Sequence, residues 1–274
     1  MSKKILTAPA VRTFQKKITS YYKKYGRNLP WRKTKNPYRI LISEIMLQQT
    51  QVDRVCEKYK EFLAVFPDFH SLAHATPGAV LRVWSGLGYN RRALALRSLA
   101  QKVMESYSGK LPCDPQTLIA LPGIGNYTAG AICAFAFNMP VLCMDTNIRR
   151  VFIHEFFQDK KNVKDQDILP LLEQTLYKEN PRLWYNALMD YGSMLKQTSE
   201  NPNKKSAHYA RQSPFANSNR QVRGAILKVL VKESPLSAAQ IAKKTKIDPE
   251  RVTNNLVRLC DEGFIQKKKN TFHL

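Results

Sequence analysis

The sequence predicts a mostly α-helical chain with a small mixed α/β unit at its C-terminal end. Over about the first two hundred residues, apolar side chains recur at helical spacing and strand-like alternation is scarce. Beyond a polar, turn-rich stretch at residues 199–206, helical patterns resume and then give way to a short hairpin pattern. The 274 residues are enough for one large core and one small core.

The first helix is expected over residues 11–25, where the chain is basic and rich in aromatic residues, and it ends at Gly26. The second is expected over residues 38–55, where Pro37 precedes a strongly apolar run. Further helices are expected at residues 57–65, 70–75, 77–85, 90–107, 115–120, 126–137, 146–157, 165–177 and 181–196. Together these segments define a first domain over residues 1–198.

Residues 199–219 have little periodicity and are expected to form an extended connector to a second domain over residues 220–274. The second domain is expected to contain a helix over 221–231, a helix from Ser237 to Lys244, a helix that Asp248 and Pro249 open and that ends near Gly263, and a hairpin over 264–274. Ser and Asp are favoured N-cap residues, and proline is favoured at the first helical position. This order of elements resembles a winged helix.

A winged helix would read DNA through its last helix, here residues 248–261, and would touch phosphates from its hairpin. The helix offers Arg251, Asn254, Asn255 and Arg258, and the hairpin offers Lys267, Lys268 and Lys269. A module that contacts another protein, or a rigid cap on the first domain, is the alternative.

The chain is strongly basic, with 44 Lys and Arg against 21 Asp and Glu and a formal net charge of +23. A sustained positive field favours polyanions, with nucleic acid ahead of an anionic membrane surface. A protein that carries its charge only for solubility is the alternative.

No apolar run reaches the roughly 20 residues that span a bilayer, and Met1–Lys4 leads into no signal-like apolar segment. We therefore expect a soluble, cytoplasmic chain without a membrane partner. Five cysteines are scattered along the chain without a CxxC pair, which supports neither a disulfide framework nor a zinc site.

Residues Leu121 to Gly125 place two glycines around one apolar residue, between two expected helices. Glycine adopts positive φ without strain and lets a ligand approach the main chain. The amides that open the next helix can then face an anion, with the helix dipole behind them. The turn therefore fits a phosphate, and an ordinary helix–helix turn is the alternative.

These residues resemble the hairpin of the helix-hairpin-helix DNA glycosylase superfamily, and Asp145 stands where that superfamily places its catalytic Asp. Bifunctional members of the endonuclease III type carry a Lys two residues after the second glycine, where this chain has Tyr127. Without that amine there is no Schiff-base nucleophile. The resemblance therefore implies a monofunctional glycosylase.

Three further segments resemble the adenine glycosylase, or MutY-type, branch of this superfamily. They are Leu29–Arg32, Ser43–Val52 and Trp84–Tyr89. The resemblance covers residues 11–196 and implies a core of two helical lobes that removes adenine mispaired with 8-oxoguanine or guanine. We expect a monomer that binds double-stranded DNA with such a mismatch or oxidised guanine.

The resemblance assigns four catalytic residues. Glu44 would protonate the adenine ring, and Asp145 would stabilise the cation-like sugar. Burial of Glu44 among its apolar neighbours would raise its pKa and keep a proton available near neutral pH. Tyr127 would hydrogen-bond near the reacting base, and Asn147 would orient Glu44 or its water. An exposed Glu44 and an Asp145 that only caps a helix are the alternatives.

An enzyme that attacks a base first takes it out of the stack. The resemblance places Arg27, Leu29, Trp31 and Asp190 at the base pocket, and makes Tyr89 the intercalating aromatic. Gln48 and Gln49, expected on the same helix as Glu44, would fill the gap. The expected DNA contacts are Gln48, Gln49, Thr50, Leu87, Tyr89, Gly123, Gly125 and Thr128. For Trp31 and Tyr89, core packing is the alternative.

The sequence departs from this branch at two places. Most members carry a four-cysteine loop for a 4Fe–4S cluster soon after the segment that is Met189–Gly192 here, and this chain has no cysteine between Cys143 and Cys260. Thiolates are the ligands that such a cluster requires, so we expect no cluster and no other metal. The branch also usually appends a Nudix-like domain that checks for 8-oxoguanine, and the winged-helix-like tail stands in its place.

Two other functions stay open at this point. Thymine or uracil mismatch glycosylases also have Tyr and Asp at the positions of Tyr127 and Asp145, although the Gln48–Gln49 pair favours adenine. A non-catalytic DNA-binding protein is the other possibility, and the intact Glu44, Tyr127 and Asp145 argue against it.

Overall fold

The structure, a computed structural model, describes residues 5–198, 200–210 and 214–274. Helices make up most of these residues, and a small sheet lies near the C-terminal end, so the expected fold class is confirmed. The chain divides into two compact units. The first holds the described residues within Met1–Glu44, Pro112–Ala120 and Ile124–Arg211, and the second those within Ile45–Leu111, Leu121–Gly123 and Gln212–Leu274.

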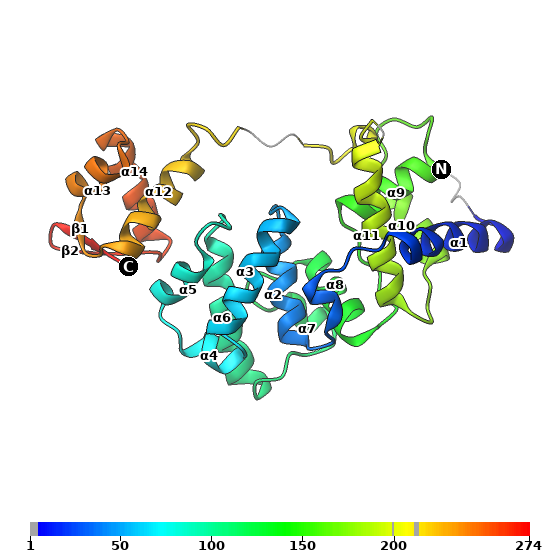
Figure 1. Cartoon of the computed structure of the whole chain (residues 1–274), viewed down its shortest axis with the longest axis horizontal. Helices are drawn as coiled ribbons and strands as arrows, with labels where there is room; N and C mark the ends of the chain where they lie inside the picture. Colours follow the sequence, from blue (N-terminus) through cyan, green and yellow to red (C-terminus); the bar gives the residue numbers. More distant parts are fainter. Residues whose placement is uncertain (1–4, 199, 211–213) are drawn as a thin grey trace. The chain divides into compact units, whose positions relative to one another are not determined.

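In the first unit, α11 packs against both α9 and α1 (Figure 1). The elements of this unit are α1 (Ala8–Tyr25), the 3-10 turn η1 (Pro30–Lys33), α2 (Pro37–Leu47) as far as Glu44, α7 (Pro115–Ile119), α8 (Asn126–Phe137), α9 (Thr146–Phe156), α10 (Asp165–Thr175), α11 (Pro181–Thr198) and the 3-10 turn η2 (Pro202–Lys205). Phe14 of α1 meets Phe152 of α9 and Trp184 of α11 edge-on, at centroid distances of 5.6 and 5.7 Å. These edge-on contacts between buried rings join the three helices.

The helices α9 and α11 approach closely because residue 192 is a glycine. A Cβ at this position would overlap the main-chain carbonyl of Asn147. At this close contact between the two helices, Arg150 of α9 donates a hydrogen bond of 2.7 Å to the carbonyl of Gly192. The start of α9, which follows Asp145, is therefore fixed against α11.

The second unit joins a group of helices, in which α6 packs against α4 and α5, to the C-terminal winged helix. Its elements are the end of α2, α3 (Val52–Val65), α4 (Phe69–His74), α5 (Pro77–Trp84), α6 (Arg91–Tyr107), α12 (Asn219–Lys232), β1 (Leu236–Ser237), α13 (Ala238–Thr245), α14 (Pro249–Asp261), β2 (Gln266–Lys268) and β3 (Thr271–His273). Trp84 and Phe62 are fully buried in this unit, with their rings nearly perpendicular at 5.8 Å.

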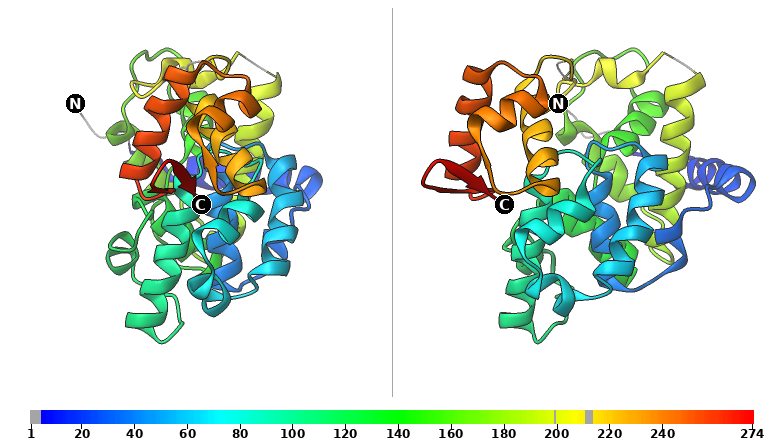
Figure 2. Two further views of the ribbon diagram at one scale, coloured as in Figure 1. Left: turned by 90° about the vertical axis from the view of Figure 1, so that its left-hand side faces the viewer. Right: turned by 60° about the vertical axis from the view of Figure 1, so that its left-hand side comes forward.

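The winged helix forms a small group of three helices and an antiparallel sheet with strand order β1-β3-β2 (Figure 2). Ser237 caps α13 through the amide of Gln240, and Asp248 caps α14 through the amide of Arg251, as the sequence predicts. Strand β1 was not expected, because two residues are too few for an alternating pattern. Asn255 is buried, with its amide bonded to the carbonyl of Arg251, so it does not extend toward DNA as the sequence suggested.

The winged helix also packs on the group of helices in its own unit. Helix α12 contacts α5. Glu262 accepts from Arg223 of α12 at 2.6 Å and forms an ion pair with Arg91 of α6 at 2.8 Å. Arg220 donates a hydrogen bond of 2.9 Å to the hydroxyl of Tyr89.

The expected single helix over residues 38–55 is wrong. Helix α2 ends at Leu47, residues 48–50 turn, and α3 begins at Val52 and continues through the segment predicted as a separate helix at 57–65. Gln49 has a φ of +54°, in the left-handed region. Nothing in the local sequence marks this break, because neither Gly nor Pro occurs there.

The expected connector is partly folded. Residues 202–205 form η2, and Val163 forms a bridge with Ser206, with hydrogen bonds of 2.8 Å to the carbonyl of Lys205 and 2.9 Å from the amide of Ala207. Positions 199 and 211–213 of this stretch lie outside the described residues. The division of the chain at residues 198 and 219 stays a prediction.

Candidate active site

Glu44 lies in the last turns of α2, whose other residues there are apolar. Its side chain is 6% exposed, and Ile42, Ile45 and Met46 beside it are buried. Burial raises the pKa of Glu44 to about 7, the charge of Asp145 raises it further, and a hydrogen bond from the Tyr127 hydroxyl (3.3 Å) opposes the rise. Glu44 can therefore hold a proton at neutral pH, which an exposed glutamate cannot.

Asp145 is the N-cap of α9, and the cap fixes its carboxylate. One oxygen accepts from the amides of Asn147 (2.8 Å) and Ile148 (2.7 Å), and the other accepts from the side-chain amide of Asn147 (2.8 Å). Burial raises the pKa of Asp145 above its usual value, and these hydrogen bonds oppose the rise. The carboxylate is thus both partly buried and held by three donors in a single orientation.

The side chain of Asn147 bonds to Asp145, and its expected role of orienting Glu44 or its water stays a prediction. Its side-chain amide donates to Asp145, and its carbonyl oxygen accepts from Arg150 at 2.8 Å. Because Arg150 also bonds to Gly192, the orientation of Asp145 is tied through Asn147 to α11.

Tyr127 is hydrogen-bonded to Glu44 and lies near enough to Asp145 to feel its charge. It lies in the first turn of α8, donates to Glu44, and has a pKa far above its usual value because it is buried and because Glu44 and Asp145 are near. Glu44, Tyr127 and Asp145 therefore form one cluster in the first unit, which joins residues from α2, α8 and the start of α9.

Asp190 of α11 is held by two arginines. Arg32 donates to both carboxylate oxygens, at 2.7 and 2.8 Å, and Arg27 donates through its side chain at 2.6 Å and its amide at 2.8 Å. These contacts lower the pKa of Asp190 against the opposing effect of burial. The motif that contains Arg32 gave no signal of this role. The charge of Arg32 also lowers the pKa of Glu44.

The remaining pocket candidates are Leu29 and Trp31, which lie at and just after the start of η1. Both are buried, at 9% and 8% exposure. This burial fits core packing as well as a pocket wall, so their contact with a base stays a prediction.

The DNA-contact candidates differ in exposure. Tyr89 is exposed, and Gly123 and Gly125 are exposed at the hairpin, where Gly123 has a φ of +79° that suits glycine. Leu87 and Thr128 are buried, at 3% exposure each. Gln48, Gln49 and Thr50 form the turn after α2 rather than part of that helix.

The described residues offer neither a metal centre nor a membrane-spanning helix. No group of three or more His, Cys, Asp and Glu side chains among them is arranged to hold a metal ion. In the described part of the chain, no helix is long and apolar enough to cross a membrane.

Known proteins share the sequence of this chain over much of its length. Residues 42–173 match the model of the HhH-GPD superfamily base excision DNA repair proteins. An adenine DNA glycosylase from Mycolicibacterium smegmatis is 33% identical over 272 residues, covering 91% of this chain and 92% of that protein. The chain belongs to the adenine DNA glycosylase family within this superfamily. The family named from the sequence motifs is therefore confirmed.

Other relatives are matched over less of their length. The adenine DNA glycosylase of Buchnera aphidicola (subsp. Baizongia pistaciae) is 38% identical over 187 residues, and the chain spans 52% of it. The one from Rattus norvegicus is 39% identical over 150 residues, and the chain spans 29% of it. Residues 220–266 separately match a winged helix-turn-helix DNA-binding family, which confirms the expected C-terminal fold.

Solved structures show the same fold. A thermostable thymine-DNA glycosylase has a TM-score of 0.62 and 25% identity, with 71% of this chain and 91% of that chain covered. A trapped complex of endonuclease III with DNA has a TM-score of 0.59 and 20% identity, with 77% of this chain and 92% of that chain covered. A non-covalent endonuclease III–DNA complex has a TM-score of 0.55 and 20% identity, with 77% of this chain and 91% of that chain covered.

Proposed function

We propose that this chain is a monofunctional adenine DNA glycosylase that hydrolyses the N-glycosidic bond of adenine mispaired with 8-oxoguanine or guanine in double-stranded DNA. The observation that carries the proposal is the cluster of Glu44, Tyr127 and Asp145, in which one carboxyl group keeps its proton near neutral pH. Membership of the family supports the reaction class.

The two carboxyl groups suit the two ends of the bond that breaks. Glu44 donates its proton to a ring nitrogen of the base, so the bonding electrons leave with a neutral adenine. Asp145 stabilises the positive charge that develops on the sugar, and water adds to C1′ and loses a proton to the Glu44 carboxylate. The products are adenine and an abasic site, and Glu44 is protonated again.

Tyr127 limits the reaction to hydrolysis. The side chain of Tyr127 has no amine. Its hydroxyl donates to Glu44 and has a pKa far above its usual value, so no phenolate forms at neutral pH. A Schiff base with the sugar, which strand cleavage by a bifunctional glycosylase requires, has no nucleophile at this position.

A thymine or uracil mismatch glycosylase is the second candidate, and the fold likeness to a thymine-DNA glycosylase favours it. The adenine assignment rests on relatives named for adenine at 31–39% identity and on the Gln48–Gln49 pair. Incubation of the protein with duplexes that contain A opposite 8-oxoguanine, A opposite G, T opposite G or U opposite G distinguishes the candidates. Abasic sites are scored by cleavage in hot alkali, with A opposite T as the control.

We expect cleavage at adenine in the first two duplexes only. Cleavage only at thymine or uracil would establish the second candidate. A protein that binds all four duplexes and cleaves none would be a DNA-binding protein without glycosylase activity.

The proposal includes no iron–sulfur cluster. The segment after α11 has no cysteine, and its described residues are held by hydrogen bonds of their own. The donor set therefore does not fit a 4Fe–4S cluster, whose ligands are thiolates.

A further inference from the structure

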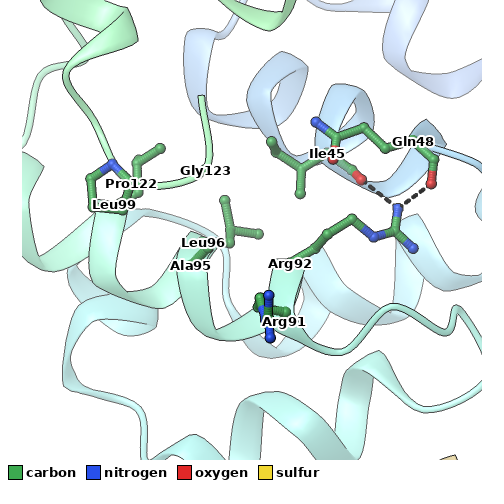
Figure 3. Close-up of a pocket in the computed structure, with 9 residues that line it drawn as sticks. All are labelled: Ile45, Gln48, Arg91, Arg92, Ala95, Leu96, Leu99, Pro122 and Gly123. Carbon is green, nitrogen blue, oxygen red and sulfur yellow. Dashed lines mark hydrogen bonds between the residues drawn. The ribbon is translucent and has the colours of Figure 1, made fainter. Parts of the chain in front are cut away.

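Arg92, near the start of α6, connects two segments of the second unit that the sequence analysis assigned to DNA contact. One amino group of its guanidinium donates to the carbonyls of Ile45 (2.7 Å) and Gln48 (2.6 Å) at the end of α2 (Figure 3). The same group donates to the carbonyl of Met46 (3.0 Å). The other donates to the Thr50 hydroxyl (3.1 Å) and to the carbonyls of Leu87 (3.3 Å) and Gly88 (3.1 Å).

This arginine replaces an ordinary helix cap. The last carbonyls of a helix lack partners within the helix, and a glycine in the left-handed region usually ends it. Here the left-handed residue is Gln49, and Arg92 satisfies carbonyls at the end of α2. Burial lowers the pKa of Arg92 to about 10, so it stays charged at neutral pH and its hydrogen bonds are charge-assisted.

The second segment has the same unusual feature. Tyr89 has a φ of +48°, again in the left-handed region, and the Arg92 guanidinium lies 5.4 Å from the centroid of its ring. A left-handed residue other than glycine is strained and persists where its surroundings enforce it, often at functional sites. Gln49 and Tyr89 both adopt this strained conformation. Arg92 donates hydrogen bonds to the residues next to them, Gln48 and Thr50 beside Gln49 and Gly88 beside Tyr89.

An aromatic ring and a cavity both adjoin the Arg92 side chain. The Trp84 ring centroid also lies 5.4 Å from its guanidinium, and a mostly apolar cavity of about 210 Å³ adjoins its side chain. Ile45, Ala95, Leu96, Leu99 and Pro122 contribute the apolar part of the cavity wall (Figure 3).

We propose that Arg92 is a positioning residue that fixes the turn at Gln48–Thr50 and the loop at Leu87–Tyr89 in one arrangement, so that the two segments act together on DNA from which a base has been extruded. The inference rests on the proposed function, because it takes both segments to contact DNA. Arg92 itself touches neither the reacting bond nor the catalytic cluster.

The test compares Arg92→Lys with Arg92→Met in the full-length protein. Lysine keeps the charge and can reach the end of α2, but a single ammonium cannot also hold Thr50 and the Leu87–Gly88 carbonyls in the geometry of the guanidinium fork. Arg82→Lys, at an exposed position of α5, is the matched control. Thermal melting reports the fold, and single-turnover excision is measured for A opposite G and for A opposite C.

Base extrusion is measured separately from catalysis. In a Glu44→Gln background, fluorescence of 2-aminopurine placed as the target base opposite G rises when the base leaves the stack. We expect Arg92→Lys to melt within a few degrees of the parent and to lose most of the rise in 2-aminopurine fluorescence. Its preference for A opposite G over A opposite C should fall about tenfold, which is the effect of losing a charge-assisted hydrogen bond. Arg92→Met should lose the rise and also melt earlier, and Arg82→Lys should behave as the parent does.

Two results would overturn the inference. One is an Arg92→Lys protein with the parent's extrusion signal and preference. The other is a loss in melting temperature that accounts for every functional loss, which would leave Arg92 a purely structural residue. If the parent extrudes the base but excises nothing, the proposed function fails and the fluorescence comparison still tests Arg92.

Discussion

Glu44 illustrates a conflict between stability and catalysis at a single residue. A carboxyl group that is 6% exposed is disfavoured when it ionises, and the same environment raises its pKa to about 7. The folded protein therefore binds a proton that the unfolded chain, with its ordinary glutamate pKa, releases. Between these two pKa values, stability falls as pH rises.

Glu44→Gln should therefore stabilise the protein at high pH. Glutamine keeps the shape of the side chain and cannot ionise. The gain in free energy of unfolding over the parent should be small at pH 4, grow as pH rises to 7, and level off at about 3 kcal/mol, from a shift between the ordinary pKa and one of about 7. Urea unfolding across this range measures it, and a gain that does not change with pH would contradict the assigned pKa.

The same pKa predicts the pH dependence of excision. The active form has Glu44 protonated, so the single-turnover rate on A opposite 8-oxoguanine should fall about tenfold per pH unit above pH 7. At acid pH the rate should fall because Asp145, whose pKa is also raised, gains a proton and no longer stabilises the sugar cation. Glu44→Gln should abolish excision and retain DNA binding. A rate that is flat from pH 6 to pH 9 would exclude Glu44 as the acid.

At the scale of elements, η2 supports the start of α9 from the segment after α11. Asn203 is buried, and its side-chain amide donates a hydrogen bond of 2.8 Å to the carbonyl of Thr146, the residue after Asp145. Thr146 is exposed, so the bond is expected to contribute as a typical intramolecular hydrogen bond does, about 0.5–1.5 kcal/mol.

Asn203→Ala should accordingly lower the free energy of unfolding by about 0.5–1.5 kcal/mol, since it removes this hydrogen bond from a buried side chain. Lys204→Ala, on an exposed neighbouring residue, should change it by less than about 0.5 kcal/mol. Chemical denaturation of the two variants measures the difference. Equal effects would mean that η2 does not brace α9.

Sequence patterns predicted the elements whose signals are local. Ser237 and Asp248 mark helix starts by their own capping chemistry, and both cap as expected. The end of α2 was missed because its cause, Arg92, lies more than forty residues away along the chain. The bond from Arg32 to Asp190 was missed for the same reason, because 158 residues separate the two along the chain. The bond from Asn147 to Asp145 spans only two residues; it was missed because a capping Asp indicates main-chain donors and not a neighbouring side-chain amide.

At the scale of the whole molecule, the net charge of +23 is the property that most affects DNA binding. Each lysine that neutralises a phosphate adds about 0.9 to the slope of log affinity against log salt concentration. Strand β2 and the turn after it expose Lys267, Lys268 and Lys269.

Replacing Lys267, Lys268 and Lys269 together by Gln should reduce that slope by up to about 2.7 if all three bind phosphates. Replacing the exposed Lys16, Lys23 and Lys24 of α1 by Gln removes the same charge and serves as the control. Fluorescence anisotropy with a labelled duplex from 50 to 300 mM salt gives both slopes. Equal slopes for the two triple variants would mean that the wing makes no particular phosphate contacts.

The stretch from Pro202 to Ala207 reaches its place with amide, hydroxyl and main-chain partners alone. All of these partners belong to the polypeptide chain. On the proposal that the protein holds no iron–sulfur cluster, we expect this stretch to fold without iron and repair by the protein to continue under metal starvation.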